Sequence, residues 1–301
     1  MDASVVFGTP RKLPKAAGLS GRVVVLDIAF AAGEGGGASF EKVTRPFIQG
    51  LGDRLAAWVD HHDHVRHVDY RDDDRFLLAT KAQHGACPEM VTEELVRRTG
   101  PIDTIVCHND FDGLFSAAKW LRGGVEPYAG ADDDARCIDT RTGEPSELGR
   151  LLDRALRSSF DESLRHQMVR FLAHGASDAG QHADFVAAAT AFERKLAVTQ
   201  ALADGHYAVY GQTAICDLAG VQIDSPGYDR TELLLAGQAR AQVALVADNQ
   251  SVTLATGFDS GINFLTLLGV TGGMPTVLSI SRSQLPRAIE ALRKAGLYTG
   301  P

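Results

Sequence analysis

The chain has 301 residues, 45% of them hydrophobic, which excludes a disordered or collagen-like protein and predicts two packed domains. Acidic residues outnumber basic ones by 38 to 30, so the chain lacks the global positive field that would hold long duplex nucleic acid. No apolar run reaches the roughly 18 residues of a membrane span, and the N-terminus lacks the apolar core of a signal peptide, so we expect a cytoplasmic protein with no membrane partner.

The first part of the chain predicts alternating strands and helices. Residues 22–30 form a β-branched apolar run of strand length, and the glycine-rich residues 33–37 end it in a loop. Helix-like apolar spacing over 44–57 leads into a short strand that ends in Asp-His-His at 60–62. The alternation continues with a helix at 88–99, a strand at 103–110 and a helix at 114–121. This order predicts an α/β fold with a mainly parallel sheet and helices on both faces.

The rest of the chain changes in pattern. Residues 147–203 are largely helical, interrupted at 173–184, and predict a helical linker. After residue 205, short strands separated by turns close with a helix at 283–296, which predicts a smaller α+β domain. We therefore expect a catalytic domain at 1–197 and a substrate-binding domain at 206–301.

The acidic runs and the cysteines of the sequence have ordinary structural explanations. The acidic runs Asp72–Asp74 and Asp132–Asp134 are typical of solvated loops. The four cysteines contain no C-x-x-C pair, which argues against a disulfide framework or a thiolate zinc site and predicts buried, reduced thiols: Cys87, Cys107, Cys137 and Cys216.

Polar side chains stand at the ends of three predicted strands. The first strand ends at Asp27, the second at Asp60-His61-His62, and the third runs into His108-x-Asp110-x-Asp112-Gly113. In α/β sheets, ligands bind beyond the carboxyl ends of the parallel strands. If these strands are neighbours, the carboxylates converge and repel one another unless a cation lies among them. The sequence therefore predicts a metal site.

The ligand types narrow the choice of ion. Carboxylates and imidazoles without thiolates suit Mn²⁺, Mg²⁺ or Co²⁺ better than structural zinc. The candidate ligands are Asp27, His61, His108, Asp110 and Asp112, and these five exceed what one catalytic ion usually takes from protein. Two ions about 3.5–4 Å apart can instead share a carboxylate and activate water for attack on phosphorus. Gly113 would let the backbone turn tightly and approach a phosphate. Each residue alone also has an ordinary interpretation as a helix cap, a turn residue or a surface histidine.

These residues resemble the DHH family of phosphoesterases. Asp60-His61-His62 resembles the signature that names the family, and residues 108–118 resemble its H-x-D-x-D-G-x-x-S-A-A motif. Asp27 resembles the single strand-end aspartate that precedes the signature. In the family the H-x-D-x-D-G element comes first, whereas here it follows the other two, which a circular permutation explains.

The resemblance implies a hydrolase with two metal ions, typically Mn²⁺, and a role for each matching residue. Five residues would bind metal, with Asp27 bridging the ions: Asp27, His61, His108, Asp110 and Asp112. His62 would contact phosphate or act as an acid, and Asp60 would orient a histidine.

The remaining resemblance covers later segments. The family supplies one more aspartate before its helical linker, and Asp178 lies in a comparable loop, where it could instead cap the next helix. Residues 206–301 resemble the DHH-associated domain, whose glycine loop grips the substrate. Here Gly272-Gly273 precede Met274 where the family has histidine, and the glycine pair fits either a phosphate nest or a plain tight turn.

These features predict a short substrate, such as an oligonucleotide cleaved in an exonuclease-like reaction, a linear or cyclic dinucleotide, or a nucleoside bisphosphate. Three alternatives stay open: an inorganic pyrophosphatase-like activity, a non-catalytic metal-dependent nucleotide-binding protein, and a dehydrogenase. The last rests on Gly33-x-Gly35-x-x-Ala38, which satisfies the dinucleotide fingerprint but begins six residues beyond Asp27 instead of at the strand end.

Overall fold

The computed structural model describes residues 3–33, 39–159, 161–223, 225 and 227–301. The chain divides into two compact units. The first unit is Met1–Ala189 with Thr271–Gly273, and the second is Thr190–Val270 with Met274–Pro301. The assignment of residues 1–197 and 206–301 to the two DHH-type domains stays a prediction. Gly35 and Ala38 of the dinucleotide fingerprint lie outside the described residues.

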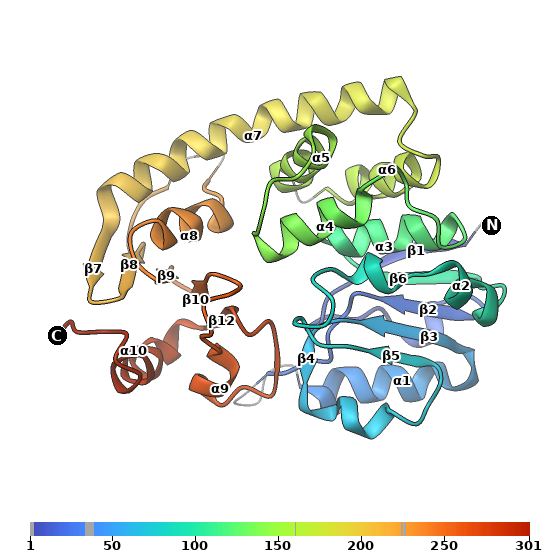
Figure 1. Cartoon of the computed structure of the whole chain (residues 1–301), viewed down its shortest axis with the longest axis horizontal. Helices are drawn as coiled ribbons and strands as arrows, with labels where there is room; N and C mark the ends of the chain where they lie inside the picture. The colour runs from blue at the N-terminus through green and yellow to red at the C-terminus, as the bar shows by residue number, and fades with distance from the viewer. Residues whose placement is uncertain (1–2, 34–38, 160, 224, 226) are drawn as a thin grey trace. The chain divides into compact units, whose positions relative to one another are not determined.

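The first unit is built on a five-stranded sheet in which every neighbouring pair of strands is parallel (Figure 1). Its spatial order is β1-β6-β2-β3-β5. The strands are β1 (Ser4–Gly8), β2 (Val23–Leu26), β3 (Leu55–Asp60), β5 (Phe76–Leu78) and β6 (Thr104–His108). The sheet order matters for function because it makes β6, β2 and β3 consecutive neighbours.

Alternate residues of these strands face opposite sides of the sheet, as the strand period requires. Val23 and Val25 pack in one buried cluster with α1 (Arg45–Leu51). Val24 and Leu26 pack in another cluster with α3 (Phe111–Leu121). The apolar run of β2 is thus continuous because both faces of the sheet are covered, and Figure 1 shows α1 and α3 on opposite faces.

The first unit contains further helices besides α1 and α3. They are α2 (Glu93–Thr99), α4 (Ala131–Thr140), α5 (Glu147–Ser158), α6 (Glu162–Ala173) and α7 (Ala179–His206), whose length includes the boundary between the units. Short 3-10 helices lie at Ala16–Gly18, Gly52–Arg54, Val65–Tyr70 and Cys87–Met90, and in the second unit at Arg282–Gln284, and a π-helical turn lies at Phe40–Thr44.

Two local predictions are wrong. The helix expected over 44–57 ends at Leu51, because Gly52 adopts a positive φ of 55° and the chain then enters β3. The run Asp132–Asp134 is the first turn of α4 and not a solvated loop. Asp134 is buried and accepts hydrogen bonds from the Ser146 amide and the Tyr128 hydroxyl, which satisfy its carboxylate.

The second unit contains a mixed five-stranded sheet of order β12-β10-β9-β8-β7. Its strands are β7 (Tyr207–Tyr210), β8 (Thr213–Asp217), β9 (Val243–Ala247), β10 (Ser251–Thr256) and β12 (Val277–Ser281), and only β8 and β9 pair in parallel. Val243 and Leu245 face α9 (Phe264–Leu268) and α10 (Leu285–Lys294), whereas Ala244 and Val246 face α8 (Arg230–Gln238). The predicted fold class, a parallel α/β sheet followed by helices and an α+β region, is confirmed.

A small two-stranded ladder belongs to the first unit although its strands are distant in sequence. β4 (Asp63–His64) pairs antiparallel with β11 (Gly272–Gly273), and the Val65 amide donates to the Thr271 carbonyl at 3.0 Å. The segment directly after Asp-His-His is therefore held by the glycine pair.

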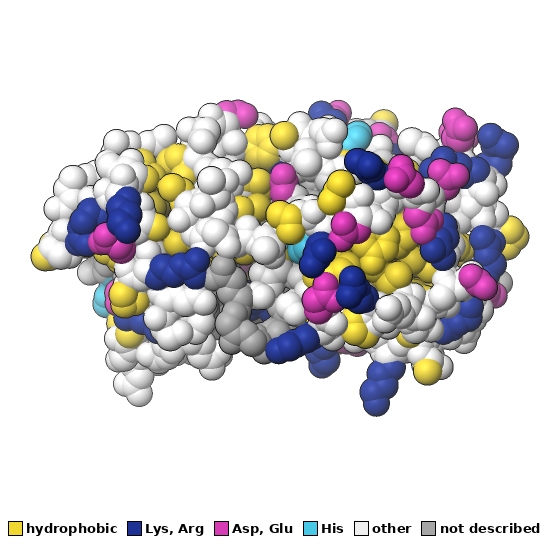
Figure 2. Space-filling view, turned by 90° about the horizontal axis from the view of Figure 1, so that it is seen from below, with side chains coloured by type: hydrophobic (Ala, Val, Ile, Leu, Met, Phe, Trp, Pro, Cys, Tyr) yellow, Lys and Arg dark blue, Asp and Glu magenta, His cyan; other side chains and the backbone are white. Residues whose placement is uncertain are grey.

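The cysteines, the lengths of the helices and the surface charge also bear on the predictions from the sequence. Its cysteines are free, and Cys87, Cys107 and Cys216 are buried. Within that part, none of the helices combines the length and the apolar character needed to cross a membrane. Figure 2 shows Lys and Arg side chains interspersed with Asp and Glu side chains on the face it presents.

Candidate metal centre

The three polar strand ends meet at one edge of the parallel sheet. Asp27 follows β2, which lies between β6, ending at His108, and β3, ending at Asp60 and followed by His61. Because the central strand presents Asp27 between the other two, this carboxylate has imidazoles on both sides. The convergence predicted from the sequence is therefore seen in the structure.

Asp27 is held in an uncommon state. Its backbone has a φ of 56°, its amide donates to the Val59 carbonyl at 2.8 Å, and its side chain is fully buried. Neither carboxylate oxygen has a hydrogen-bond partner. Burial, together with repulsion from Asp112 and Asp110, raises the pKa of Asp27 to about 6. A buried carboxylate without hydrogen-bond partners is costly, and a bound cation between the carboxylate and its histidine neighbours would compensate it.

One group of potential ligands, which we call site A, consists of Asp27, His108 and Asp110, whose ligand atoms lie within 4.8 Å of one another. Nδ1 of His108 is 3.7 Å from Asp27 Oδ2 and 2.5 Å from Asp110 Oδ2, yet it has no partner in hydrogen-bond geometry. Asp110 also caps α3, since its Oδ1 accepts from the Gly113 amide at 3.3 Å. The cap fixes the carboxylate so that its other oxygen faces His108.

A second group, which we call site B, consists of His61, Asp112 and Asp139. Nε2 of His61 lies 3.2 Å from Asp112 Oδ2, 3.6 Å from Asp139 Oδ2 and 3.2 Å from Oδ1 of Asp27. Asp27 thus stands between the two sites. Its contact with His61 also makes Asp27, His61 and His62 a third possible ligand group.

The orientation of His61 is set from behind. Its Nδ1 lies 2.9 Å from the His84 carbonyl, which only accepts, so Nδ1 carries a hydrogen and Nε2 faces the carboxylates. Burial alone would lower the pKa of His61, but interaction with Asp112 and Asp27 outweighs burial and raises the pKa to about 10. Without metal, His61 is an imidazolium among carboxylates, and a bound cation would replace its Nε2 proton.

His62 and Asp60 form a pair beside this centre. Nδ1 of His62 donates to Asp60 Oδ1 at 2.8 Å, and Asp60 is fully buried. Burial would raise the pKa of Asp60, yet the charge and hydrogen bond of His62 outweigh it and lower that pKa. Asp60 therefore stays ionised and orients His62, whose side chain remains 18% exposed and able to meet a ligand.

Lys81 brings a positive charge into site B. Its side chain is 2% exposed, its Nζ lies 3.2 Å from His61 Nε2, and it forms an ion pair with Asp139. Sequence reasoning missed both residues. Asp139 lies inside α4 and Lys81 in the turn after β5, so neither stands at the end of a parallel strand.

Asp178, predicted as the additional metal ligand, is not brought to this cluster. It is exposed at the start of α7, where its Oδ1 accepts from the Gln181 amide at 2.9 Å, so it has the alternative role of a helix cap. The aspartate that the structure supplies from a helix after the H-x-D-x-D-G element is Asp139.

The three candidate substrate-binding glycines have clear packing roles. A Cβ on Gly113 would lie 2.5 Å from the His108 carbonyl oxygen, and one on Gly272 would lie 2.7 Å from the Asp63 carbonyl oxygen. Gly273 has a φ of 124°. Glycine is thus needed where α3 approaches β6 and where β11 pairs with β4. Any role of these glycines in substrate binding stays a prediction.

The donor set fits a divalent cation with a preference for oxygen and nitrogen ligands. Asp27, Asp110, Asp112 and Asp139 supply carboxylates, and His61 and His108 supply imidazole nitrogens. The nearby thiols are unsuited as ligands, because burial raises the pKa of Cys87 and of Cys107 well above the ordinary value. This chemistry matches Mn²⁺, Mg²⁺ or Co²⁺.

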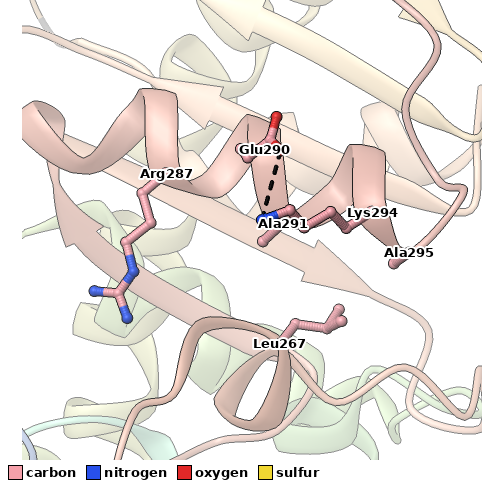
Figure 3. Close-up of a pocket in the computed structure, with 6 residues that line it drawn as sticks. All are labelled: Leu267, Arg287, Glu290, Ala291, Lys294 and Ala295. Carbon is pink, nitrogen blue, oxygen red and sulfur yellow. Dashed lines mark ion pairs between the residues drawn. The ribbon is translucent and has the colours of Figure 1, made fainter.

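The second unit contains a pocket of a different kind, with a volume of about 400 Å³ (Figure 3). Its lining residues are Leu267, Arg287, Glu290, Ala291, Lys294 and Ala295. Glu290 and Lys294 form an ion pair of 3.6 Å across one turn of α10. Such surface pairs contribute little energy, and the lining includes none of the predicted site residues.

Comparisons with known proteins give little further information. No protein-family model matches the chain, and no curated protein matches it. Among solved structures, the chain is similar to a pGpG-specific phosphodiesterase, PggH from Vibrio cholrae, with 14% sequence identity and a TM-score of 0.35. The similarity covers 49% of this chain and 57% of that chain, so this chain spans somewhat over half the length of that protein. Function therefore has to be argued from the side chains described above.

Proposed function

We propose that the chain is a divalent-metal-dependent phosphoesterase that hydrolyses phosphodiester or phosphomonoester bonds of a short nucleotide substrate. The observation that carries this proposal is Asp27, whose two buried oxygens lack hydrogen-bond partners and face ligand groups on both sides. Carboxylates that converge in this way are arranged for a cation, and paired cation positions around a shared carboxylate are typical of phosphoryl-transfer sites.

The roles of the residues follow from their geometry. Asp27, His108 and Asp110 would hold a cation at site A, and His61, Asp112 and Asp139 offer a second position at site B. When bound, divalent ions supply activation of water and neutralise charge that develops on phosphoryl oxygens.

His62 has the properties expected of a proton donor. Asp60 accepts from Nδ1 of His62, which leaves Nε2 directed away from that bond and available to a phosphate oxygen or a leaving-group oxygen. His62 is also more exposed than His61, whose side chain is fully buried. We therefore assign metal binding to His61 and substrate contact or proton donation to His62.

The charge of the chain favours a short substrate. The net charge is −8, and Figure 2 shows mixed rather than uniformly basic charge on the face it presents. A long strand is bound mainly by basic side chains along its phosphates. A linear or cyclic dinucleotide, an oligonucleotide of a few residues or a nucleoside bisphosphate needs only a local positive centre, which bound cations would provide.

The test combines metal content with turnover. The purified protein is loaded with Mn²⁺, desalted and analysed for metal, and it is then assayed with a generic phosphodiester, a dinucleotide panel, nucleoside bisphosphates and inorganic pyrophosphate. We expect bound Mn²⁺ and Mn²⁺-dependent cleavage of one nucleotide class. Cleavage of pyrophosphate alone would replace the proposal by a pyrophosphatase, and tight nucleotide binding without cleavage would replace it by a binding protein.

Variants separate the assigned roles. Asp112→Asn should lose turnover and any ion held at site B, whereas His62→Gln should keep the metal content of wild type and lose turnover by roughly 100-fold or more, the usual contribution of a general acid. Asp178→Asn is the matched control, because it changes an exposed aspartate outside the cluster. Near-normal turnover of Asp112→Asn would refute the proposed site.

A further inference from the structure

Lys81 is the one lysine that contacts the candidate metal ligands among the ion pairs and hydrogen bonds of the described residues. Its Nζ is 3.2 Å from His61 Nε2 and pairs with Asp139 Oδ2. These are two of the three ligand atoms of site B, and the third residue, Asp112, places Oδ2 3.2 Å from the same Nε2. The ammonium group thus lies where the site B ligands converge.

The backbone holds the lysine in this position. The Lys81 amide donates to Asp63 Oδ2 at 3.2 Å, and the Ala79 amide donates to the Asp60 carbonyl at 2.9 Å. The following turn is closed by the His84 amide, which donates to the Thr80 carbonyl at 3.1 Å. Because the His84 carbonyl also lies 2.9 Å from Nδ1 of His61, the turn that carries Lys81 is tied at both ends to the segment that carries His61. Its side chain, 2% exposed, has no solvent-facing position in this arrangement.

An ammonium group and a divalent ion compete for such a site. Both are attracted by the carboxylates of Asp139 and Asp112 beside Nε2 of His61, and two cations at the same ligands repel each other. A lysine at this position also neutralises one carboxylate charge, as an ion there would. Site A differs, because His108 lies against Asp27 and Asp110, and Arg165, whose charge interacts with Asp110, donates its Nε hydrogen to the Asn109 carbonyl at 3.0 Å.

We propose that Lys81 occupies site B in the resting protein, so that the chain binds one divalent ion tightly, at site A, and admits a second ion only when Lys81 is displaced. This inference rests on the proposed function, because it needs site A to be a metal site. It alters the expectation of two equivalent ions: the second positive group of the centre is supplied by the chain itself.

The test is the metal stoichiometry of the whole protein, measured without reference to activity. Wild type and Lys81→Met are loaded with Mn²⁺, desalted and analysed for metal per chain, and stepwise binding is followed by calorimetry and by Mn²⁺ electron paramagnetic resonance. We expect one tightly bound ion in wild type and two in Lys81→Met, with the second ion bound at least about tenfold more tightly than in wild type. The resonance of the variant should show two coupled Mn²⁺ ions.

Lys119→Met is the matched control. Lys119 is another buried lysine of the first unit that pairs with an aspartate, Asp132 at 2.5 Å, and it also donates to the Pro88 carbonyl. Its removal should leave the stoichiometry at one ion. A second ion in this variant too would show that loss of any buried lysine loosens the unit, which overturns the specific role of Lys81.

The outcomes separate this inference from the proposed function. Two equally tight ions in wild type, or one ion in folded Lys81→Met, would overturn the role of Lys81 and leave a metal-dependent phosphoesterase standing. No bound ion in any variant would overturn the proposed function itself. If Lys81→Met does not fold, Lys81→Gln keeps a polar group in the turn without the charge, and the same stoichiometries decide.

Discussion

Replacing Asp27 by asparagine should make the metal-free protein more stable and remove the stabilisation by metal. Asparagine has nearly the same shape and tolerates a positive φ better than most residues, so the backbone at 56° is preserved. The variant therefore removes one negative charge from the centre of the site and little else.

The magnitude follows from the pKa of Asp27, which is raised from 3.8 to about 6. This rise in the pKa corresponds to roughly 3 kcal/mol of destabilisation of the folded state when the Asp27 carboxylate is ionised. Burying an amide without partners offsets roughly 1–2 kcal/mol of that gain. At pH 7.5 in EDTA, Asp27→Asn should thus be more stable than wild type by about 1–2 kcal/mol.

The sign of the pH dependence gives an internal check. Because the folded pKa is raised, the contribution of Asp27 to stability is fully present below pH 3.8 and is lost as the pH rises through about 6. The free energy of unfolding of wild type should therefore drop below that of the variant as the pH rises from 4 to 6. At pH 4 the variant should have lost its advantage.

The assay is urea unfolding followed by tryptophan fluorescence. Both tryptophans, Trp58 and Trp120, are buried in the first unit, so their emission reports on the unit that contains the site. Saturating Mn²⁺, at about 100 times its dissociation constant, should add about 2.7 kcal/mol to wild type and much less to the variant. A variant that is less stable than wild type in EDTA, or equally stabilised by Mn²⁺, would refute the reasoning.

Three further predictions concern the same unit. In Lys81→Met protein, adding Asp139→Ala should weaken binding of the second Mn²⁺ ion by about tenfold or more. Adding Asp178→Ala instead should leave metal binding unchanged and lower stability by about 1 kcal/mol through loss of a helix cap. Calorimetry and urea unfolding distinguish the two, and equal metal affinity in both double variants would contradict this. The Mn²⁺ affinity of the native protein should fall as the pH falls. The plot of the logarithm of this affinity against pH should steepen below about pH 6, because Asp27 is then protonated and, like its histidine neighbours, must release a proton before the ion binds. A slope that stays constant from pH 8 to pH 5 would contradict the arrangement. Gly113→Ala should cost several kcal/mol, because its Cβ would lie 2.5 Å from a backbone oxygen, and the urea midpoint would show whether this approach is as tight as described.

The sequence was sufficient to predict the parallel sheet and the convergence at its edge. Continuous β-branched runs indicated strands buried on both faces, and polar residues at their ends indicated the edge where ligands bind. Asp27, His61 and His108 follow this rule, because each stands at the end of a strand or just beyond it. The strands that lead to these residues, β6, β2 and β3, are consecutive neighbours in the sheet, which the order of the chain alone does not reveal.

Asp139 and Lys81 could not be found in the same way. Asp139 is one of several acids within α4, and whether it faces the site depends on how that helix packs against α3. Lys81 follows a short strand in a polar turn, where a lysine is ordinarily solvated. The loop position of Asp178 predicts a metal ligand, but the residue stands at a helix start, where the Gln181 amide gives its carboxylate a local partner instead.

The pairing of β1 with β6 has a consequence for how this protein is made. Ser4 pairs with Thr104, so the sheet cannot close until β6 has been synthesised, and the centre, which draws on residues from Asp27 to Asp139, can be completed only later. At about 5–20 residues per second, the ribosome needs roughly 6–20 s between Asp27 and Asp139. Until β6 has been synthesised, β1 has no partner strand and is open to wrong pairing and to chaperones. If these residues bind a metal ion as proposed, its capture would be a late event, and a cell poor in the ion would release a completed fold whose carboxylates still repel one another.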